Sequence, residues 1–171
     1  PGSFAVARGV RAPQGDGGAS RPESDRGDSA RRGEGGSMRV LIAEDDFAGQ
    51  AVLEGLLSPH GECDIARDGE EAMALFDAAL AAGRPYDLVC LDIMMPKLDG
   101  KEVLRRVREL EKERGRTGLA GAKILMTTAL NDFETIMASF RGQCEGYLVK
   151  PISKVKLLAQ LRALGLLPPE E

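Results

Sequence analysis

One stretch near the middle of the chain constrains the fold more than any other. Its apolar run, residues 88–91, ends on Asp92 and is followed by a loop that contains a proline and closes with Gly100. A short apolar run between turn residues is typical of a strand buried on both faces, as in a parallel sheet. Asp92 thus falls at the carboxyl end of a predicted strand, and in open α/β sheets ligands bind in the crevice outside those ends.

Three more apolar runs end on polar side chains in the same way. Their polar ends are the acidic residues 44–46, Thr128 and Lys150, and a shorter strand-like run covers residues 62–66. Segments with helical spacing separate the runs, and strands that alternate with helices predict a parallel sheet covered by helices on both faces. The expected fold class is therefore α/β: a doubly wound, five-stranded parallel sheet with right-handed crossovers.

The predicted helices follow from apolar residues that recur every three or four positions. They run from about residue 46 to 57, 68 to 82, 100 to 113, 131 to 140 and 153 to 164, with a loop over residues 114–121. Asp46 has a side chain that is preferred for capping the first turn of a helix. The first helix is expected to bury an apolar face made of Val52, Leu53, Leu56 and Leu57.

Composition argues against several classes of function. A net charge of −4 and an aromatic content of 4% give no support to nucleic-acid binding. Cys63, Cys90 and Cys144 lie in or beside apolar runs, which indicates buried, reduced thiols of a cytoplasmic protein rather than a disulfide framework or a zinc site. No apolar run is long enough to span a membrane, so no membrane partner is expected.

The two ends of the chain differ from its middle. Residues 1–37 are rich in Gly, Arg and Ser without an apolar period, so they are predicted to form a disordered leader. The leader could also be a flexible tether to another domain. A third reading is that Met38 is the natural start and that residues 1–37 come from read-through of an untranslated region before it. One domain is expected over residues 38–167 with a short tail over 168–171, which leaves no room for a DNA-binding output domain.

The acidic groups at the strand ends indicate a metal site. Glu44, Asp45 and Asp92 would converge on one crevice, where they would repel one another and raise one another's pKa. A hard divalent cation relieves this repulsion, and Mg²⁺ typically takes one or two carboxylates, waters and phosphate oxygens. A second register, in which Asp45 and Asp46 form the acidic pair, stays open. The first is preferred because Glu44 and Asp45 close the strand and Asp46 then caps the helix.

The polar residues at the four strand ends, in this order and spacing, resemble the receiver domain of two-component response regulators over roughly residues 38–167. These residues are the acidic group 44–46, Asp92, Thr128 and Lys150. The resemblance implies the flavodoxin-like strand order 2-1-3-4-5, which the bacterial chemotaxis regulator has. It implies that Asp92 is the phosphoacceptor. It also implies that Asp45, Asp92 and the backbone carbonyl of Met94 ligate Mg²⁺ directly, and that Glu44 acts through a water.

The same resemblance assigns roles to residues at the ends of the last two strands. Lys150 is expected to place its charge on a phosphoryl oxygen, and the Thr128 hydroxyl is expected to hydrogen-bond another. Thr128 and Tyr147 fit the family's switch pair, which repacks the surface of the fourth helix, the fifth strand and the fifth helix. The bond between Lys150 and Pro151 resembles the family's cis peptide.

The predicted function is that of a single-domain signalling switch and not of an enzyme. It would take a phosphoryl group from a phosphohistidine of a histidine kinase or phosphotransfer protein, contact a downstream protein, and form a homodimer on phosphorylation. The alternatives are a receiver piece of a larger regulator and a scaffold that is never phosphorylated. An Asp-dependent phosphatase usually has a second Asp two residues after the first, where this chain has Met94.

Three further residues bear on the prediction. The only histidine, His60, lies in a predicted turn, whereas a phosphodonor histidine needs an exposed helical position. Gln143 stands where receivers often have a glycine, so the turn after the fourth helix is expected to differ. Met94 and Leu130, both apolar, are expected to overhang the phosphoryl group and slow its hydrolysis.

Overall fold

The computed structural model describes residues 36–129 and 143–171. The helix predicted near residues 131–140, Leu130 and nearly all of the predicted leader lie outside the described residues. The predicted domain boundaries therefore stay predictions.

The described residues form one sheet of five strands, all parallel. The strands are β1 (Met38–Ala43), β2 (Gly61–Ala66), β3 (Leu88–Asp92), β4 (Lys123–Thr128) and β5 (Gly146–Val149). Their spatial order is β2-β1-β3-β4-β5, which confirms the predicted fold class and strand order. β1 and β3 lie in the interior of the sheet, where each is covered on both faces.

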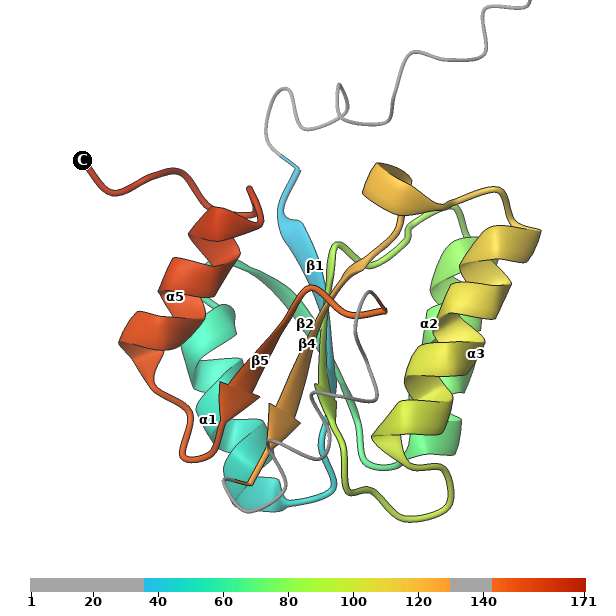
Figure 1. The fold of residues 1–171 in the computed structure, drawn as a ribbon, viewed down its shortest axis with the longest axis horizontal. Helices are drawn as coiled ribbons and strands as arrows, with labels where there is room; N and C mark the ends of the chain where they lie inside the picture. Colours follow the sequence, from blue (N-terminus) through green and yellow to red (C-terminus); the bar gives the residue numbers. More distant parts are fainter. Residues whose placement is uncertain (1–35, 130–142) are drawn as a thin grey trace, which may run out of the picture.

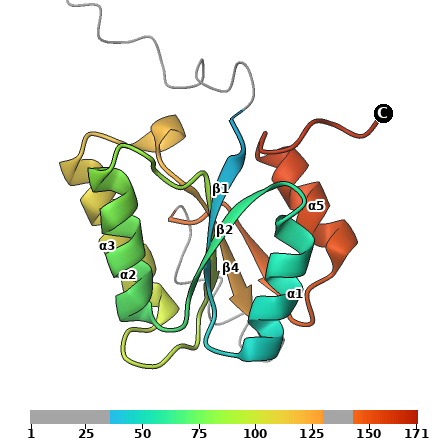
Figure 2. The ribbon, with the colours of Figure 1, turned by 180° about the vertical axis from the view of Figure 1, so that it is seen from behind.

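Helices cover the sheet on both sides. The described helices are α1 (Phe47–Leu57), α2 (Gly69–Ala81), α3 (Gly100–Glu113) and α5 (Lys154–Ala163), with a 3₁₀ turn, η2 (Gly118–Ala120), inside the predicted loop. Figures 1 and 2 show α1 and α5 on one face and α2 and α3 on the other. No helix in the described ranges is both long enough and apolar enough to cross a bilayer.

Two hydrophobic cores result, one on each face of the sheet. In β1, Val40 and Ile42 pack with the buried leucines of α1 and α5, whereas Leu41 and Ala43 pack with α2 and α3. Successive strand residues point to opposite faces, so a strand that is covered on both faces must be apolar at every position. This is why the central strands appear in the sequence as unbroken apolar runs.

Capping side chains fix where α1 and α2 begin, shortly after β1 and β2 end. Asp46 accepts a hydrogen bond from the Gly49 N–H at 2.8 Å, and Asp68 accepts one from the Glu71 N–H at 2.9 Å. The predicted cap at Asp46 is confirmed. Because the strands are parallel, these loops gather at one edge of the sheet.

The side-chain burial corrects two predictions. Val52 is 46% exposed, because the buried stripe of α1 runs through Gln50, Leu53 and Leu57 and Val52 lies beside it. All three cysteines are free thiols, but only Cys90 in the central strand β3 is fully buried. Cys63 is half-buried because β2 is an edge strand, and Cys144 is half-buried because it precedes β5, the other edge strand.

Candidate functional site

The strand register sets which side chains meet at the carboxyl edge of the sheet. Asp92 of β3 pairs with Thr127 of β4, and Thr127 pairs with Leu148 of β5. One residue earlier, Ala43 of β1 pairs with Leu91, so Glu44 follows β1 at the level of Asp92. β1 ends one residue before the predicted acidic pair, which leaves Glu44 and Asp45 in the loop that leads to α1.

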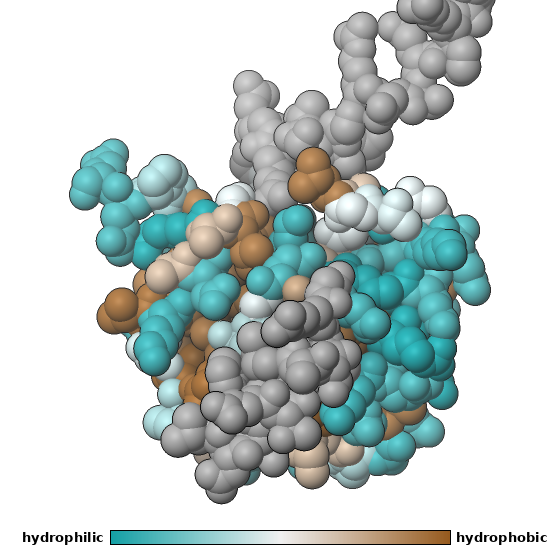
Figure 3. All heavy atoms as spheres, in the orientation of Figure 1, coloured by the Kyte–Doolittle hydropathy of each residue, from teal (hydrophilic) through white to brown (hydrophobic). Residues whose placement is uncertain are grey.

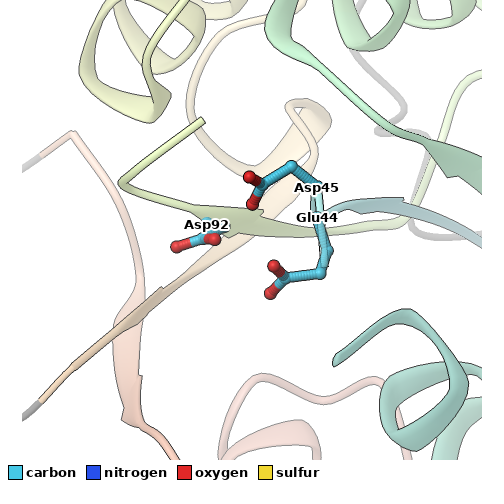
Figure 4. Close-up of side chains that lie close together, drawn as sticks. All are labelled: Glu44, Asp45 and Asp92. Atoms are coloured by element: carbon cyan, nitrogen blue, oxygen red, sulfur yellow. The ribbon is translucent and has the colours of Figure 1, made fainter. Parts of the chain in front are cut away.

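Three carboxylates converge at this edge. Oxygen atoms of Glu44, Asp45 and Asp92 all lie within 4.8 Å of one another. Figure 4 shows the two neighbouring acids from the β1 loop with their carboxylates turned toward the side on which Asp92 lies. Glu44 and Asp92 are buried, and Asp45 is exposed. Asp46 takes no part in this cluster, because its carboxylate turns back to cap α1.

Lys150 brings a positive charge into the cluster. Its Nζ lies 2.7 Å from a carboxylate oxygen of Glu44 and 3.1 Å from Oδ2 of Asp92. The peptide bond between Lys150 and Pro151 is cis, as predicted. The Lys150 N–H also donates to the Thr128 carbonyl at 2.8 Å, which continues the β4–β5 ladder by one hydrogen bond.

Burial and charge act in opposite directions on the groups of this cluster. Burial raises the pKa of the Glu44 carboxyl, Lys150 lowers it, and Asp92 raises it further, with a net rise. For Lys150, burial lowers the pKa of the ammonium, but the hydrogen bonds to Glu44 and Asp92 outweigh that effect and raise it. With all groups ionised, three carboxylates and one ammonium leave two negative charges in a partly buried crevice.

The donor set of this crevice fits Mg²⁺. Hard divalent cations prefer oxygen ligands, and Glu44, Asp45 and Asp92 offer carboxylate oxygens close together in the described part of the chain. The two excess negative charges match the charge of the cation. The individual ligand roles, including that of the Met94 carbonyl, stay predictions.

Two residues of α1 support Glu44, and the sequence patterns did not single them out. A Cβ on Gly49 would lie 2.9 Å from the carboxyl carbon of Glu44, so glycine leaves room for that side chain. Gln50, which is buried, donates from Nε2 to the Glu44 carbonyl at 2.7 Å. A glycine inside a helical pattern was the available signal, but it does not distinguish Gly49 from Gly55, which lies in the same helix with nothing against it.

Of the other predicted site residues, Met94 contacts Asp92, and Thr128 and Tyr147 belong to the neighbouring strands β4 and β5. Thr128 is buried and donates from its hydroxyl to the Ala129 carbonyl at 3.1 Å. Met94 is 70% exposed, and its N–H donates to Oδ1 of Asp92 at 3.3 Å. Tyr147 is half-buried against the core on the α2 and α3 face, where burial and then Cys144 raise its pKa.

The fold and the site together define a doubly wound α/β domain with an acidic, lysine-containing crevice at the carboxyl ends of its strands. The chain belongs to the response regulator receiver domain family of two-component signalling, whose family model matches residues 40–162.

Curated relatives and solved structures agree with this assignment. The chain is 37% identical over 128 residues to the response regulator MprA of Mycolicibacterium vanbaalenii, and 36% identical over the same length to MprA of Mycobacterium avium. The match covers 74% of this chain and 50% of either relative, so the chain spans about half the length of these relatives.

Among solved structures, the fold is similar to the receiver domain of Ssk1 from Saccharomyces cerevisiae, crystallised with the histidine phosphotransfer protein Ypd1. The TM-score is 0.64 with 26% identity, over 80% of this chain and 96% of that chain. CheY of Borrelia burgdorferi, in a CheX–CheY–BeF₃–Mg²⁺ complex, gives a TM-score of 0.63 with 28% identity, over 77% and 91% of the two chains.

Proposed function

We propose that this chain is a phosphorylation switch in which Asp92 accepts a phosphoryl group from a phosphohistidine of a partner protein. The observation that carries the proposal is the convergence of Glu44, Asp45 and Lys150 on the carboxylate of Asp92. A buried carboxylate with an ammonium and two further acids beside it is equipped to bind a cation and an anionic phosphoryl group together.

In the proposed reaction, a carboxylate oxygen of Asp92 forms a bond to phosphorus as the bond between phosphorus and the imidazole nitrogen breaks. The imidazole leaves with the electron pair of that bond, and the product is an acyl phosphate. Phosphoryl transfer needs little covalent chemistry from the protein, so positioning and charge carry the catalysis. The chain is therefore a switch that promotes its own modification rather than an enzyme with other substrates.

Each residue of the crevice has a role in this proposal. Lys150 would move its ammonium to a phosphoryl oxygen, and the Thr128 hydroxyl would turn from the Ala129 carbonyl to donate to another. Glu44, Asp45, Asp92 and the Met94 carbonyl would hold Mg²⁺, directly or through water. When bound, Mg²⁺ supplies positive charge against the negative charge of the transferring group.

Phosphorylation would change the structure of the domain at its last two strands, β4 and β5. Thr128 and Tyr147 belong to neighbouring strands, and movement of the threonine toward the phosphoryl group would open space for the tyrosine ring. The surface around β5 and α5, with the helix predicted before β5, would then repack and bind a downstream protein or a second copy of the chain. The size of this shift is limited by the difference in phosphoryl-group interactions between the two states.

A larger regulator is the second candidate, because the chain spans about half the length of the curated relatives it matches. In either case we propose a histidine kinase or phosphotransfer protein in the cytoplasm as the phosphodonor. The crystallised pair of Ypd1 and the Ssk1 receiver domain supports a partner of this kind.

The test is mass spectrometry after incubation with acetyl phosphate, with and without Mg²⁺. We expect Mg²⁺-dependent phosphorylation that maps to Asp92 and is lost in Asp92→Asn. Asp99→Asn is the matched control: Asp99 caps α3 in the loop after Asp92, and asparagine caps equally well. If neither the wild type nor Asp99→Asn is phosphorylated under any condition, the phosphorylation proposal fails and the scaffold alternative takes its place.

A further inference from the structure

Thr127 carries a polar group that the proposed function leaves without a role. The residue is fully buried, and its hydroxyl oxygen has no hydrogen-bond partner within the described ranges. Burying a hydroxyl without a partner costs free energy, and most buried polar atoms in proteins are paired. An unpaired hydroxyl next to a functional site therefore calls for a physical reason.

The register places the Thr127 side chain next to that of Asp92. Thr127 pairs with Asp92 on one side and with Leu148 on the other, and paired residues of neighbouring strands point to the same face of the sheet. Lys150 lies two residues beyond Leu148. Its ammonium reaches Asp92 on β3 and Glu44 after β1, so its side chain must cross the end of β4, where Thr127 lies.

The charges of the cluster indicate when the hydroxyl would be used. The Lys150 ammonium has three donors and now holds the carboxylates of Glu44 and Asp92. Those same carboxylates are the proposed ligands of Mg²⁺. A cation bound to these carboxylates would repel the Lys150 ammonium and weaken its ion pairs with Glu44 and Asp92. The ammonium would then need another hydrogen-bond acceptor. A threonine hydroxyl has two lone pairs that can accept.

We propose that Thr127 is a positioning residue for Lys150: its hydroxyl oxygen accepts a hydrogen bond from the ammonium once a cation has engaged Glu44 and Asp92. This inference rests on the proposed function, because it requires a cation at those carboxylates. It assigns to Thr127 the task of holding the ammonium close to the site, ready for an incoming phosphoryl oxygen.

The simpler explanation is that Thr127 is a β-branched residue suited to a strand, in which case its hydroxyl is incidental. Thr127→Val separates the two explanations, because valine keeps the shape and the branching and removes only the hydroxyl. Thr127→Ser keeps the hydroxyl and removes the methyl group. A role of the hydroxyl predicts that serine preserves the behaviour of the wild type and that valine does not.

The experiment is calorimetric titration of Mg²⁺ into the wild type and the two variants. We expect Thr127→Val to weaken Mg²⁺ binding roughly tenfold, as for the loss of one hydrogen bond to a charged group. We expect Thr127→Ser to stay close to the wild type. In a Lys150→Met background the effect of Thr127→Val should vanish, because no ammonium is left to be held.

Metal-free melting temperatures complete the test. Thr127→Val should melt at or above the temperature of the wild type, because it removes an unpaired buried hydroxyl. A lower melting temperature would show that the hydroxyl is paired without metal and would overturn the inference.

Unchanged Mg²⁺ affinity in Thr127→Val, or a loss that persists without Lys150, would also overturn the inference and leave the proposed function intact. A wild type that binds no Mg²⁺ would overturn both.

Discussion

At the scale of single residues, Gly49 decides where the Glu44 carboxylate can lie. A Cβ at position 49 would meet that carboxyl group at 2.9 Å, whereas a Cβ at Gly55, on the same helix, would meet nothing within 4 Å. Glycine in a helix interior is less stable than alanine by roughly 0.5–1 kcal/mol. The two glycines therefore separate the effect of alanine on the helix from its effect on the site.

We expect Gly55→Ala to raise the free energy of unfolding by about 0.5–1 kcal/mol. Gly49→Ala should lose this gain and bind Mg²⁺ more weakly, because the methyl group pushes Glu44 away from Asp45 and Lys150. Urea unfolding and calorimetric titration measure the two effects. Equal stability of the two variants, together with the Mg²⁺ affinity of the wild type, would contradict the role of Gly49.

At the scale of elements, α3 presents a charged face to solvent, and Figure 3 shows hydrophilic side chains over its side of the molecule. Glu102 in its first turn accepts hydrogen bonds from Arg105 at 2.6 and 2.9 Å and from Arg106 at 2.8 Å. Arg105 and then Arg106 lower the pKa of Glu102 to about 2 from an ordinary value of 4.5. Both pairs lie at helical spacings of three and four residues.

This pKa predicts how the stability contribution of Glu102 changes with pH. The pKa is lower in the folded state, so the contribution is fully present above pH 4.5 and is lost as the pH falls toward 2. Glu102→Gln should melt slightly below the wild type at pH 7, with the difference shrinking at pH 3. The effect is small because the ion pairs are solvent-exposed.

Glu113→Gln on the same helix is the control, since Glu113 forms no ion pair with any residue in the described ranges. A deficit of Glu102→Gln that is unchanged at pH 3 would contradict the assignment of the low pKa to Glu102.

At the scale of the whole molecule, the cluster of three carboxylates exists only in the folded chain. Asp45 and Asp92 belong to different strand ends and meet because β1 and β3 are neighbours in the sheet. A ligand that binds only the folded state stabilises it by about 2.7 kcal/mol at a concentration of 100 times its Kd. Mg²⁺ binding at this cluster would therefore be coupled to folding.

We expect saturating Mg²⁺ to raise the melting temperature of the wild type and of Asp99→Asn by the same amount. Asp45→Asn should show a much smaller rise, because it removes a carboxylate from the cluster and leaves the fold intact. Differential scanning calorimetry with and without Mg²⁺ measures the shift. A full shift in Asp45→Asn would remove Asp45 from the set of ligands.

Much of the architecture could be predicted because burial on both faces leaves a local pattern. The run that ends on Asp92 and the runs that end on residues 44–46, Thr128 and Lys150 mark strands and one functional edge of the sheet. The strand order needed the resemblance to a family, since alternation of strands and helices is compatible with several orders. Val52 was placed wrongly because helical spacing indicates an apolar face but not its exact width.

By itself, the sequence determined the class of fold, the edge of the sheet at which the candidate site lies and the types of residue found there. Each of these follows from patterns of residues that are close together in the sequence. Only the tertiary structure decided which side chains touch. The ion pair between Lys150 and Glu44, the packing of Gly49 against Glu44 and the unpaired hydroxyl of Thr127 depend on strand register and helix placement. These are set by the packing of the two cores as a whole, and no local pattern encodes them.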